Sequence, residues 1–327
     1  MEATSSMTLY PLRFQPLLRR YVWGGRRLAE VLGKPIGEET CAESWEVADH
    51  GDDQSLVAAG PLAGRTLREL VAEHGEELFG RHAGQRQFPL LLKFLDAARA
   101  LSVQVHPNDE QAARLDPPDR GKTEAWVVIE AQTGSTIYAG LKRGIDRAAL
   151  ERELVRGTCE QVLHRIEPRA GDVIFIPAGT VHALGGSLVV AEIQQSSDTT
   201  FRLFDWNRLG ADGQPRPLHI DEALAVIDFA RGPVDPVEPQ ATERPHVSRL
   251  VTCEQFILER MTLAAPEPVG GDQRFHLLAV IEGAALVDGD PTGRPLAKGD
   301  TLLLPAAVGA VTVRPLGSAV LLDSFLP

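Results

Sequence analysis

A short signature occurs twice in this chain, and it restricts the fold more than any other feature. Gly171–Pro177 reads GDVIFIP, and Gly299–Pro305 reads GDTLLLP. The tripeptide Val-Ile-Glu precedes each copy, at 128–130 and at 280–282. The two landmarks lie farther apart in the first copy, where a helix is predicted over 146–157. The chain therefore carries one β-unit twice, with a helix inserted in the first copy.

The remaining pattern predicts a mainly β protein. Short apolar segments alternate with corners of Gly, Asp and Pro, which is typical of jelly-roll barrels. Helical spacing of apolar residues predicts a few short helices, over 66–79, 146–155 and 221–229. Four prolines among charged residues at 231–246 mark the best domain boundary. We predict an N-terminal domain over 1–235 and a C-terminal β domain over 236–327.

The overall charge excludes some classes of partner. The 327 residues carry a formal net charge of −12, whereas a nucleic-acid-binding protein needs a basic face. The three cysteines form no CxxC pair, and their odd number argues against a disulfide framework. The start, Met1–Thr8, has no apolar core of a signal peptide, and no apolar run reaches membrane-spanning length. We predict a cytoplasmic protein with neither nucleic acid nor membrane as a partner.

The segment Leu101–Pro107 has an unusual polar face. It reads LSVQVHP, so apolar and polar residues alternate strictly. Successive side chains of a strand point to opposite faces, and Gln104 and His106 therefore share one face. Pro107 ends the strand because it has no N–H for the ladder. This polar face is suited to holding a ligand.

A second histidine follows the first copy of the repeated signature. The pattern Gly171-x5-Pro177-x-Gly179-x2-His182 has the spacing of the second motif of cupin barrels. Gly179 permits a tight turn, after which the next strand carries His182 back into the barrel. The second copy has Ala310 at the matching position. We therefore predict two cupin-type jelly-roll barrels, of which the second is degenerate and only the first holds a metal ion.

Glu124 is the third candidate ligand because it begins a predicted strand in the segment KTEAW. Together with Gln104, His106 and His182 it gives two nitrogen and two oxygen donors. Imidazoles and a carboxylate suit zinc with an open coordination position, although iron and manganese accept such ligands as well. We interpret the other histidines as structural or surface residues; they are His50, His74, His82, His164, His219, His246 and His276.

Two cations accompany these candidates. Lys122 lies two residues from Glu124 and therefore on the same face of its strand. Arg202 lies in an alternating segment, TFRLF, between apolar residues. In a chain with a net charge of −12, two cations directed at one pocket supply the local field that an anionic substrate needs.

Several motifs, in the same order, resemble the type I mannose-6-phosphate isomerases, and the length resembles their short bacterial form. The match spans roughly residues 10–230 and rests on the segments WGG at 23–25, ESWE at 43–46, LSVQVHPND at 101–109, KTEAW at 122–126, GTVHAL at 179–184 and SDTTFRLFDW at 197–206.

The resemblance implies one zinc ion held by Gln104, His106, Glu124 and His182. It also implies catalytic and substrate-binding roles for Lys122 and Arg202. We assign Trp45 and Glu46, in the ESWE segment, to substrate binding as well. The implied reaction interconverts mannose 6-phosphate and fructose 6-phosphate through an enediolate.

Alternatives remain open at this stage. Lys122, His50 and Glu46 are all candidates for the base that moves the proton. A related sugar phosphate is an alternative substrate, and a non-catalytic sugar-phosphate-binding cupin is an alternative function. A metal-dependent oxygenase is disfavoured because it has no use for Lys122 and Arg202. The pattern is compatible with a monomer or a dimer.

Overall fold

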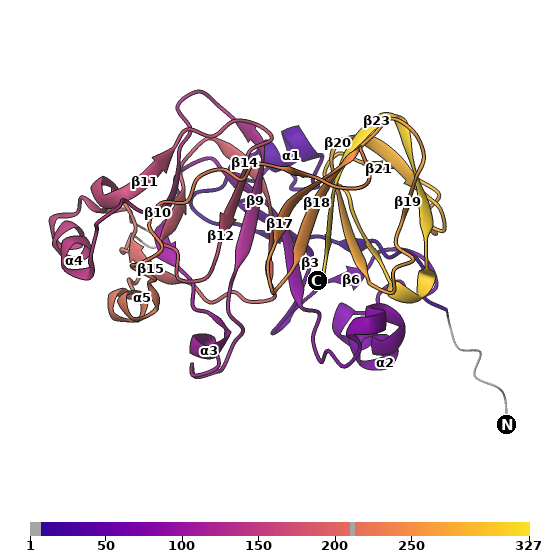
Figure 1. Cartoon of the computed structure of the whole chain (residues 1–327), viewed down its shortest axis with the longest axis horizontal. Coiled ribbons are helices and arrows are strands. Elements are labelled where there is room, and N and C mark those ends of the chain that lie inside the picture. Colours follow the sequence, from indigo (N-terminus) through magenta and orange to yellow (C-terminus); the bar gives the residue numbers. More distant parts are fainter. Residues whose placement is uncertain (1–7, 210–212) are drawn as a thin grey trace. The chain divides into compact units, whose positions relative to one another are not determined.

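The computed structural model of the protein describes residues 8–209 and 213–327. Most of the segment Met1–Thr8, on which the prediction about a signal peptide rests, lies outside the described residues. The chain forms two compact units (Figure 1). We call Leu17–Trp45 with Leu90–Glu238 the first unit. The second unit comprises the residues up to Pro16, Glu46–Pro89 and Pro239–Pro327.

Two β-sheets build the first unit. The five-stranded sheet has the order β11-β10-β13-β8-β15, and the six-stranded sheet has the order β12-β9-β14-β7-β3-β2. The strands of the five-stranded sheet are β8 (Val103–Val105), β10 (Ile137–Leu141), β11 (Leu163–Ile166), β13 (His182–Leu184) and β15 (Phe201–Phe204). Those of the six-stranded sheet are β2 (Leu17–Arg19), β3 (Glu43–Val47), β7 (Leu90–Ala97), β9 (Glu124–Ala131), β12 (Val173–Ile176) and β14 (Leu188–Gln195).

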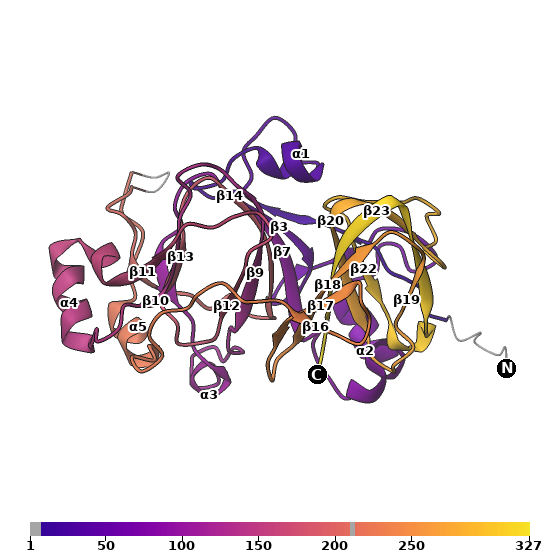
Figure 2. The same cartoon turned by 45° about the horizontal axis from the view of Figure 1, so that its top comes forward.

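The apolar core of the first unit lies between these two sheets. Trp126 and Val190 come from the six-stranded sheet, and Ile137 and Leu184 come from the five-stranded sheet. Figure 2 shows β10, β11 and β13 on one side, and β7, β9 and β14 on the other. Every residue of β7 and of β14 is buried, so both faces of these strands are covered, which explains why most of their residues are apolar. Any charged residue in these strands is therefore buried and needs a partner.

The helices of the first unit are short. They are α1 (Arg27–Leu32), α3 (Asp109–Ala112), α4 (Arg147–Arg156) and α5 (Ile220–Val226). The Asp146 side chain accepts a hydrogen bond from the Ala149 N–H and so caps α4, which ends at Gly157 with φ of 71°. The inserted helix expected in the first copy of the repeat is thus confirmed, with the cap and the stop predicted from the sequence.

The second unit contains an eight-stranded sheet, in which six strands have the order β16-β17-β18-β23-β20-β21, β19 pairs with β23, and β22 pairs with β20. Its strands are β16 (Gln240–Ala241), β17 (Val247–Thr252), β18 (Ile257–Leu263), β19 (Glu267–Val269), β20 (His276–Val287), β21 (Leu296–Ala297), β22 (Thr301–Leu304) and β23 (Val311–Phe325). Shorter elements of this unit are β1 (Phe14–Gln15), β4 (Asp49–His50), β5 (Asp53–Gln54), β6 (Leu56–Val57) and α2 (Leu67–Phe79).

The two copies of the repeated signature pair in the same way. In the first unit Ile176, just before Pro177, pairs with Glu124. In the second unit Leu304, just before Pro305, pairs with His276. The internal repeat is therefore confirmed at the level of strand register, and the predicted mainly β fold with a few short helices is confirmed as well. None of the helices in the described residues is both long and apolar enough to cross a membrane.

Helix α2 begins with a capping box. The Thr66 hydroxyl accepts a hydrogen bond from the Glu69 N–H at 3.1 Å, and the Glu69 carboxylate accepts one from the Thr66 N–H at 2.7 Å. Because the cap satisfies N–H groups that have no partner within the helix, we expect Thr66→Ala to lower the free energy of unfolding by about 1 kcal/mol. Urea denaturation followed by circular dichroism measures this loss.

The matched control is Glu76→Ala, which truncates an exposed side chain of the same helix. It should change the free energy of unfolding by less than about 0.5 kcal/mol. Equal losses in the two variants would show that the cap contributes nothing to stability.

Candidate metal centre

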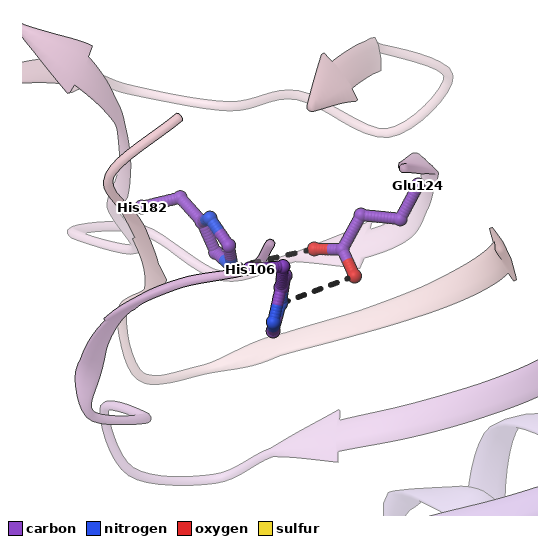
Figure 3. A group of neighbouring side chains, drawn as sticks. All are labelled: His106, Glu124 and His182. Atoms are coloured by element: carbon purple, nitrogen blue, oxygen red, sulfur yellow. Dashed lines mark ion pairs between the residues drawn. The ribbon is translucent and has the colours of Figure 1, made fainter. Parts of the chain in front are cut away.

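Three buried ionisable side chains meet between the two sheets of the first unit. His106 follows β8 and His182 begins β13, both in the five-stranded sheet, whereas Glu124 begins β9 in the facing sheet. Their ligand atoms all lie within 4.8 Å of one another. Figure 3 shows both imidazoles turned toward the carboxylate, with His106 Nε2 at 3.6 Å from one oxygen and His182 Nε2 at 3.3 Å from the other.

Backbone carbonyls fix the tautomer of both histidines. His106 Nδ1 donates to the Thr199 carbonyl at 2.9 Å, and His182 Nδ1 donates to the Thr180 carbonyl at 2.8 Å. A carbonyl oxygen can only accept, so each Nδ1 carries the proton and each Nε2 keeps its lone pair. This outer hydrogen bond is typical of histidines that bind metals.

Burial keeps both imidazoles neutral. It lowers the pKa of His182 to about 3 despite the opposing hydrogen bond to Thr180. Burial, followed by the charge of Lys122, lowers the pKa of His106 well below its usual value. Both rings are therefore unprotonated at neutral pH, as metal coordination requires.

The Glu124 carboxylate has an incomplete set of partners. Its Oε1 is buried and receives no hydrogen bond in the described residues, although His182 lies 3.3 Å away. Burial raises the pKa of Glu124 to about 7, with Lys122 acting in the opposite direction. A buried carboxylate between two imidazole lone pairs is stabilised by a cation. The donor atoms of this group therefore fit a metal ion.

Gln104 lies beside this group, opposite His182 in the pairing of β8 with β13. Its Nε2 is 3.3 Å from His182 Nε2, and its Oε1 accepts a hydrogen bond from the Ser102 hydroxyl at 3.2 Å. The amide nitrogen of Gln104, and not its oxygen, therefore lies next to His182. Its role as a metal ligand stays a prediction.

A chain of alternating charges continues from Glu124 along the wall of the first unit. The Lys122 ammonium contacts Glu124 and lies 3.1 Å from His106 Nε2 and 3.9 Å from Glu192. Lys93 lies 3.7 Å from Glu192 and 3.6 Å from Glu43. Burial lowers the pKa of Lys93, but the two carboxylates outweigh it and hold that pKa above its usual value. Lys93 is therefore a buried cation.

A cavity of about 280 Å³ opens beside these residues within the first unit. Four cations line it, namely Lys93, Lys122, Arg202 and Arg216. Its carboxylates are Glu43, Glu192 and Asp198, and its aromatic lining comes from Tyr21, Trp23 and Trp126. A pocket of this size with converging polar groups is suited to a small, charged and hydroxylated molecule.

Arg202 reaches the cavity from β15, where it pairs with Gln104 of β8. Its guanidinium donates to the Ser102 hydroxyl at 3.3 Å and to the Pro217 carbonyl at 2.8 Å. Burial, followed by the charge of Arg216, lowers the pKa of Arg202, but an arginine stays protonated at neutral pH. Neither of these two bonds pairs it with a carboxylate, so its charge remains available to an anion.

Some of the predicted site residues line the cavity and others do not. Gln104, Lys122, His182 and Arg202 line the cavity. Trp45 contacts Lys93, which lines the cavity; the Lys93 ammonium lies 4.4 Å from the centre of the Trp45 ring.

Two other candidates belong to the second unit. Glu46 accepts a hydrogen bond there from the Thr301 hydroxyl at 3.3 Å. His50 lies in the β4–β5 hairpin, paired with Asp53. Their roles in substrate binding or proton transfer stay predictions.

Sequence reasoning assigned no role to the charged residues with which β7, β14 and β3 line the cavity. Lys93 and Glu192 pair directly across β7 and β14, and each interrupts a run of apolar residues. A charge inside such a strand must be paired or belong to a functional site, so the sequence could have marked these two residues as candidate site residues. The third residue, Glu43, lies on the same face of β3 as Trp45, because side chains alternate along a strand.

The fold and this centre define a class: a β-sandwich protein whose facing sheets enclose a His–Glu–His group able to hold a metal ion. The family "Phosphomannose isomerase type I, catalytic domain" matches residues 11–139, and "Mannose-6-phosphate isomerase, cupin domain" matches residues 246–323. The chain is 38% identical to the mannose-6-phosphate isomerase ManA of Bacillus subtilis (strain 168), over 93% of this chain and 95% of that one. It belongs to the type I phosphomannose isomerase family, as its motifs predicted.

Other relatives agree with this assignment. The mannose-6-phosphate isomerase of Streptococcus mutans is 33% identical over 91% of this chain and 93% of its own length. The crystal structure of the mannose 6-phosphate isomerase from Bacillus subtilis superposes with a TM-score of 0.88 at 32% identity, covering 97% of this chain and 99% of the other. The similarity thus includes both units.

Asp119 supports the centre without touching it. Its carboxylate accepts hydrogen bonds from the hydroxyls of Ser197, at 2.9 Å, and Thr199, at 2.6 Å. It thereby holds the Thr199 carbonyl that orients His106. Outer hydrogen bonds of metal-binding histidines contribute about 10- to 100-fold to metal affinity. Both hydroxyls donate to the same Asp119 oxygen, so we expect Asp119→Ala, which removes that acceptor, to weaken the binding of added zinc about tenfold. Competition with a fluorescent chelator measures the affinity.

Two variants calibrate this experiment. Glu110→Gln removes an exposed carboxylate from α3 nearby in sequence and should leave the affinity unchanged. His182→Ala removes a ligand nitrogen and should abolish stoichiometric binding. An Asp119→Ala affinity equal to that of Glu110→Gln would exclude a positioning role for Asp119.

Proposed function

We propose that this chain is a zinc-dependent aldose–ketose isomerase that interconverts mannose 6-phosphate and fructose 6-phosphate. The observation that carries the proposal is the buried pair of neutral imidazoles with Glu124, bordered by a cavity with four cationic side chains. Membership of the type I phosphomannose isomerase family supports the same substrate.

Gln104, His106, Glu124 and His182 would hold one zinc ion. Such an ion supplies Lewis-acid chemistry, because it polarises carbonyl and hydroxyl oxygens and stabilises negative charge. Gln104 would have to present its amide oxygen, and that change needs only a half-turn of the amide about its last side-chain bond.

The protein's own cations would bind the anionic substrate. Arg202 has a planar fork of donors that matches a phosphate or an enediolate, and its charge faces no carboxylate in its two hydrogen bonds. Lys93 is held protonated by Glu43 and Glu192 and adds fixed positive charge to the same cavity. In a chain with a net charge of −12, this cluster supplies the local attraction for a dianion.

Isomerisation moves a proton from C2 to C1 of the open-chain sugar through an enediolate. Lys122, which lines the cavity, is our candidate for the group that carries the proton. The buried walls of the cavity would protect the enediolate from exchange with water.

Two further assignments, of the domains and of the location in the cell, accompany this proposal. The division into a catalytic domain over 1–235 and a C-terminal β domain over 236–327 stays a prediction. We propose a cytoplasmic location, because the cysteines Cys41, Cys159 and Cys253 are all free thiols. The alternatives are a non-catalytic sugar-phosphate-binding protein and an isomerase for a related sugar phosphate; turnover separates them.

Turnover should depend on a metal. We expect the zinc-loaded protein to convert mannose 6-phosphate to fructose 6-phosphate in a coupled assay. Dialysis against a chelator should lower the rate at least about a hundredfold, because the charge on the enediolate then loses its strongest stabilisation. Zinc should restore the rate. An inactive, stoichiometrically zinc-loaded protein would support the non-catalytic alternative instead.

Removal of Arg202 should separate metal binding from catalysis. We expect Arg202→Ala to keep one zinc ion per chain and to lower kcat/KM about 10- to 100-fold or more, because a charge-assisted hydrogen bond contributes about 1.5–3 kcal/mol. Zinc content and steady-state kinetics check the two parts. The control is Arg147→Ala, which removes an exposed arginine of α4. Equal kinetics in both variants would remove Arg202 from the site.

A further inference from the structure

The second unit repeats the strand register that builds the metal centre in the first. His276 takes the position of Glu124, since each pairs with the residue just before the proline of its signature. Two residues farther along, Trp126 pairs with Glu192, and Leu278 pairs with Asp323. Asp323 therefore takes the position of Glu192.

The correspondence extends to one more strand. Glu192 pairs with Lys93 in the first unit, and Asp323 pairs with Glu259 in the second. Three positions that carry buried charges beside the metal centre thus carry buried ionisable residues in the second unit as well. Their identities differ, so the second unit presents different chemistry at the same place in the fold.

A second cavity lies at these residues. Its volume is about 290 Å³, close to the 280 Å³ of the cavity beside the metal centre. Its cationic lining comes from Arg244, Arg249, Arg274 and His276. Its carboxylates are Glu259, Asp272 and Asp323. The lining thus holds four cations against three carboxylates once His276 is protonated, and one of the cations, Arg244, also pairs with Glu267 outside the lining at 3.4 Å.

The carboxylates hold His276 in its charged form. Its Nδ1 lies 2.9 Å from Asp323, and its Nε2 lies 3.1 Å from Asp272. Burial lowers the pKa of His276, but the two carboxylates outweigh burial and raise it to about 10. An imidazolium has no lone pair for a metal ion, so this pocket differs from the metal centre in the class of ligand it can take.

The remaining carboxylate is also paired within the protein. Glu259 accepts hydrogen bonds from Arg249 at 2.7 Å and from Arg244 at 3.1 Å. The guanidinium of Arg274 has fewer hydrogen-bond partners than those of Arg244 and Arg249. Its Nε is buried without a hydrogen-bond acceptor in the described residues and lies 3.7 Å from Asp272, beyond hydrogen-bond distance. The Phe325 ring packs 5.1 Å from its guanidinium and restricts it.

We propose that this pocket of the second unit binds a phosphate group, either free or as the monoester of a small polyol. Arg274 would donate to the phosphate, because it lines the cavity, the Phe325 ring restricts its guanidinium, and its nearest carboxylate in the described residues is 3.7 Å away. Asp272 lies beside Arg274 and would accept a hydroxyl of the polyol. The inference does not depend on the proposed isomerase activity, because no residue of the pocket belongs to the metal centre.

Hydrogen exchange on the unaltered, zinc-loaded chain tests the proposal. We expect inorganic phosphate and glycerol 3-phosphate to slow amide exchange in peptides covering 267–276 and 321–325, whereas glycerol leaves it unchanged. Stronger protection by glycerol 3-phosphate would identify the ester as the ligand, and equal protection would identify the phosphate group alone. Absence of protection by both phosphates, or equal protection by glycerol, would overturn the proposal.

A variant pair gives a second test. We expect Arg274→Ala to raise the phosphate concentration that half-protects these peptides from amide exchange at least about tenfold. Arg314→Ala removes the same charge from an exposed pair with Asp288 and should leave the affinity unchanged. Equal effects of the two variants would overturn the proposal. The first exchange experiment uses the unaltered chain, so it tests the proposal even if Arg274→Ala does not fold.

Discussion

Two hydrogen bonds to backbone carbonyls underlie the chemistry of this protein. They place the proton of His106 and of His182 on Nδ1 and leave both Nε2 lone pairs facing Glu124. The carbonyls belong to Thr199 and Thr180, in the loops that precede β15 and β13. Without these acceptors, two buried imidazoles would have unsatisfied N–H groups or the wrong tautomer. The turns of the sandwich, as well as its strands, are therefore part of the centre.

The wall beside the centre depends on alternation of charge. Glu124, Lys122, Glu192, Lys93 and Glu43 follow one another at 3.9 Å or less, and all but Glu43 are fully buried. Removal of one member would leave its neighbours as unpaired charges in a low-dielectric interior, which is more costly than the loss of one contact. This coupling keeps positive charge next to the cavity of an otherwise acidic chain.

Local patterns revealed the parts of the site that obey strand and turn geometry. The alternation in LSVQVHP and the spacing of Gly171, Pro177, Gly179 and His182 depend only on neighbouring residues, and the structure has a strand and a tight turn there. Patterns of this kind cannot show which core a segment joins. The segment 46–89 packs in the second unit, although it lies between two segments of the first. Only tertiary contacts decide that choice.

The same limit explains the difference between Glu43 and Glu46. Both belong to one four-residue motif, but an odd spacing along a strand reverses the face of the sheet. Glu43 lines the cavity, and Glu46 bonds to Thr301. The repeat shows the converse: the pairing of strands persists between the units while the chemistry changes. His276 replaces Glu124, and Ala310 stands at the place of His182 in the signature. Register delivers a side chain to a position, and the identity of that side chain then determines which chemistry the position can support.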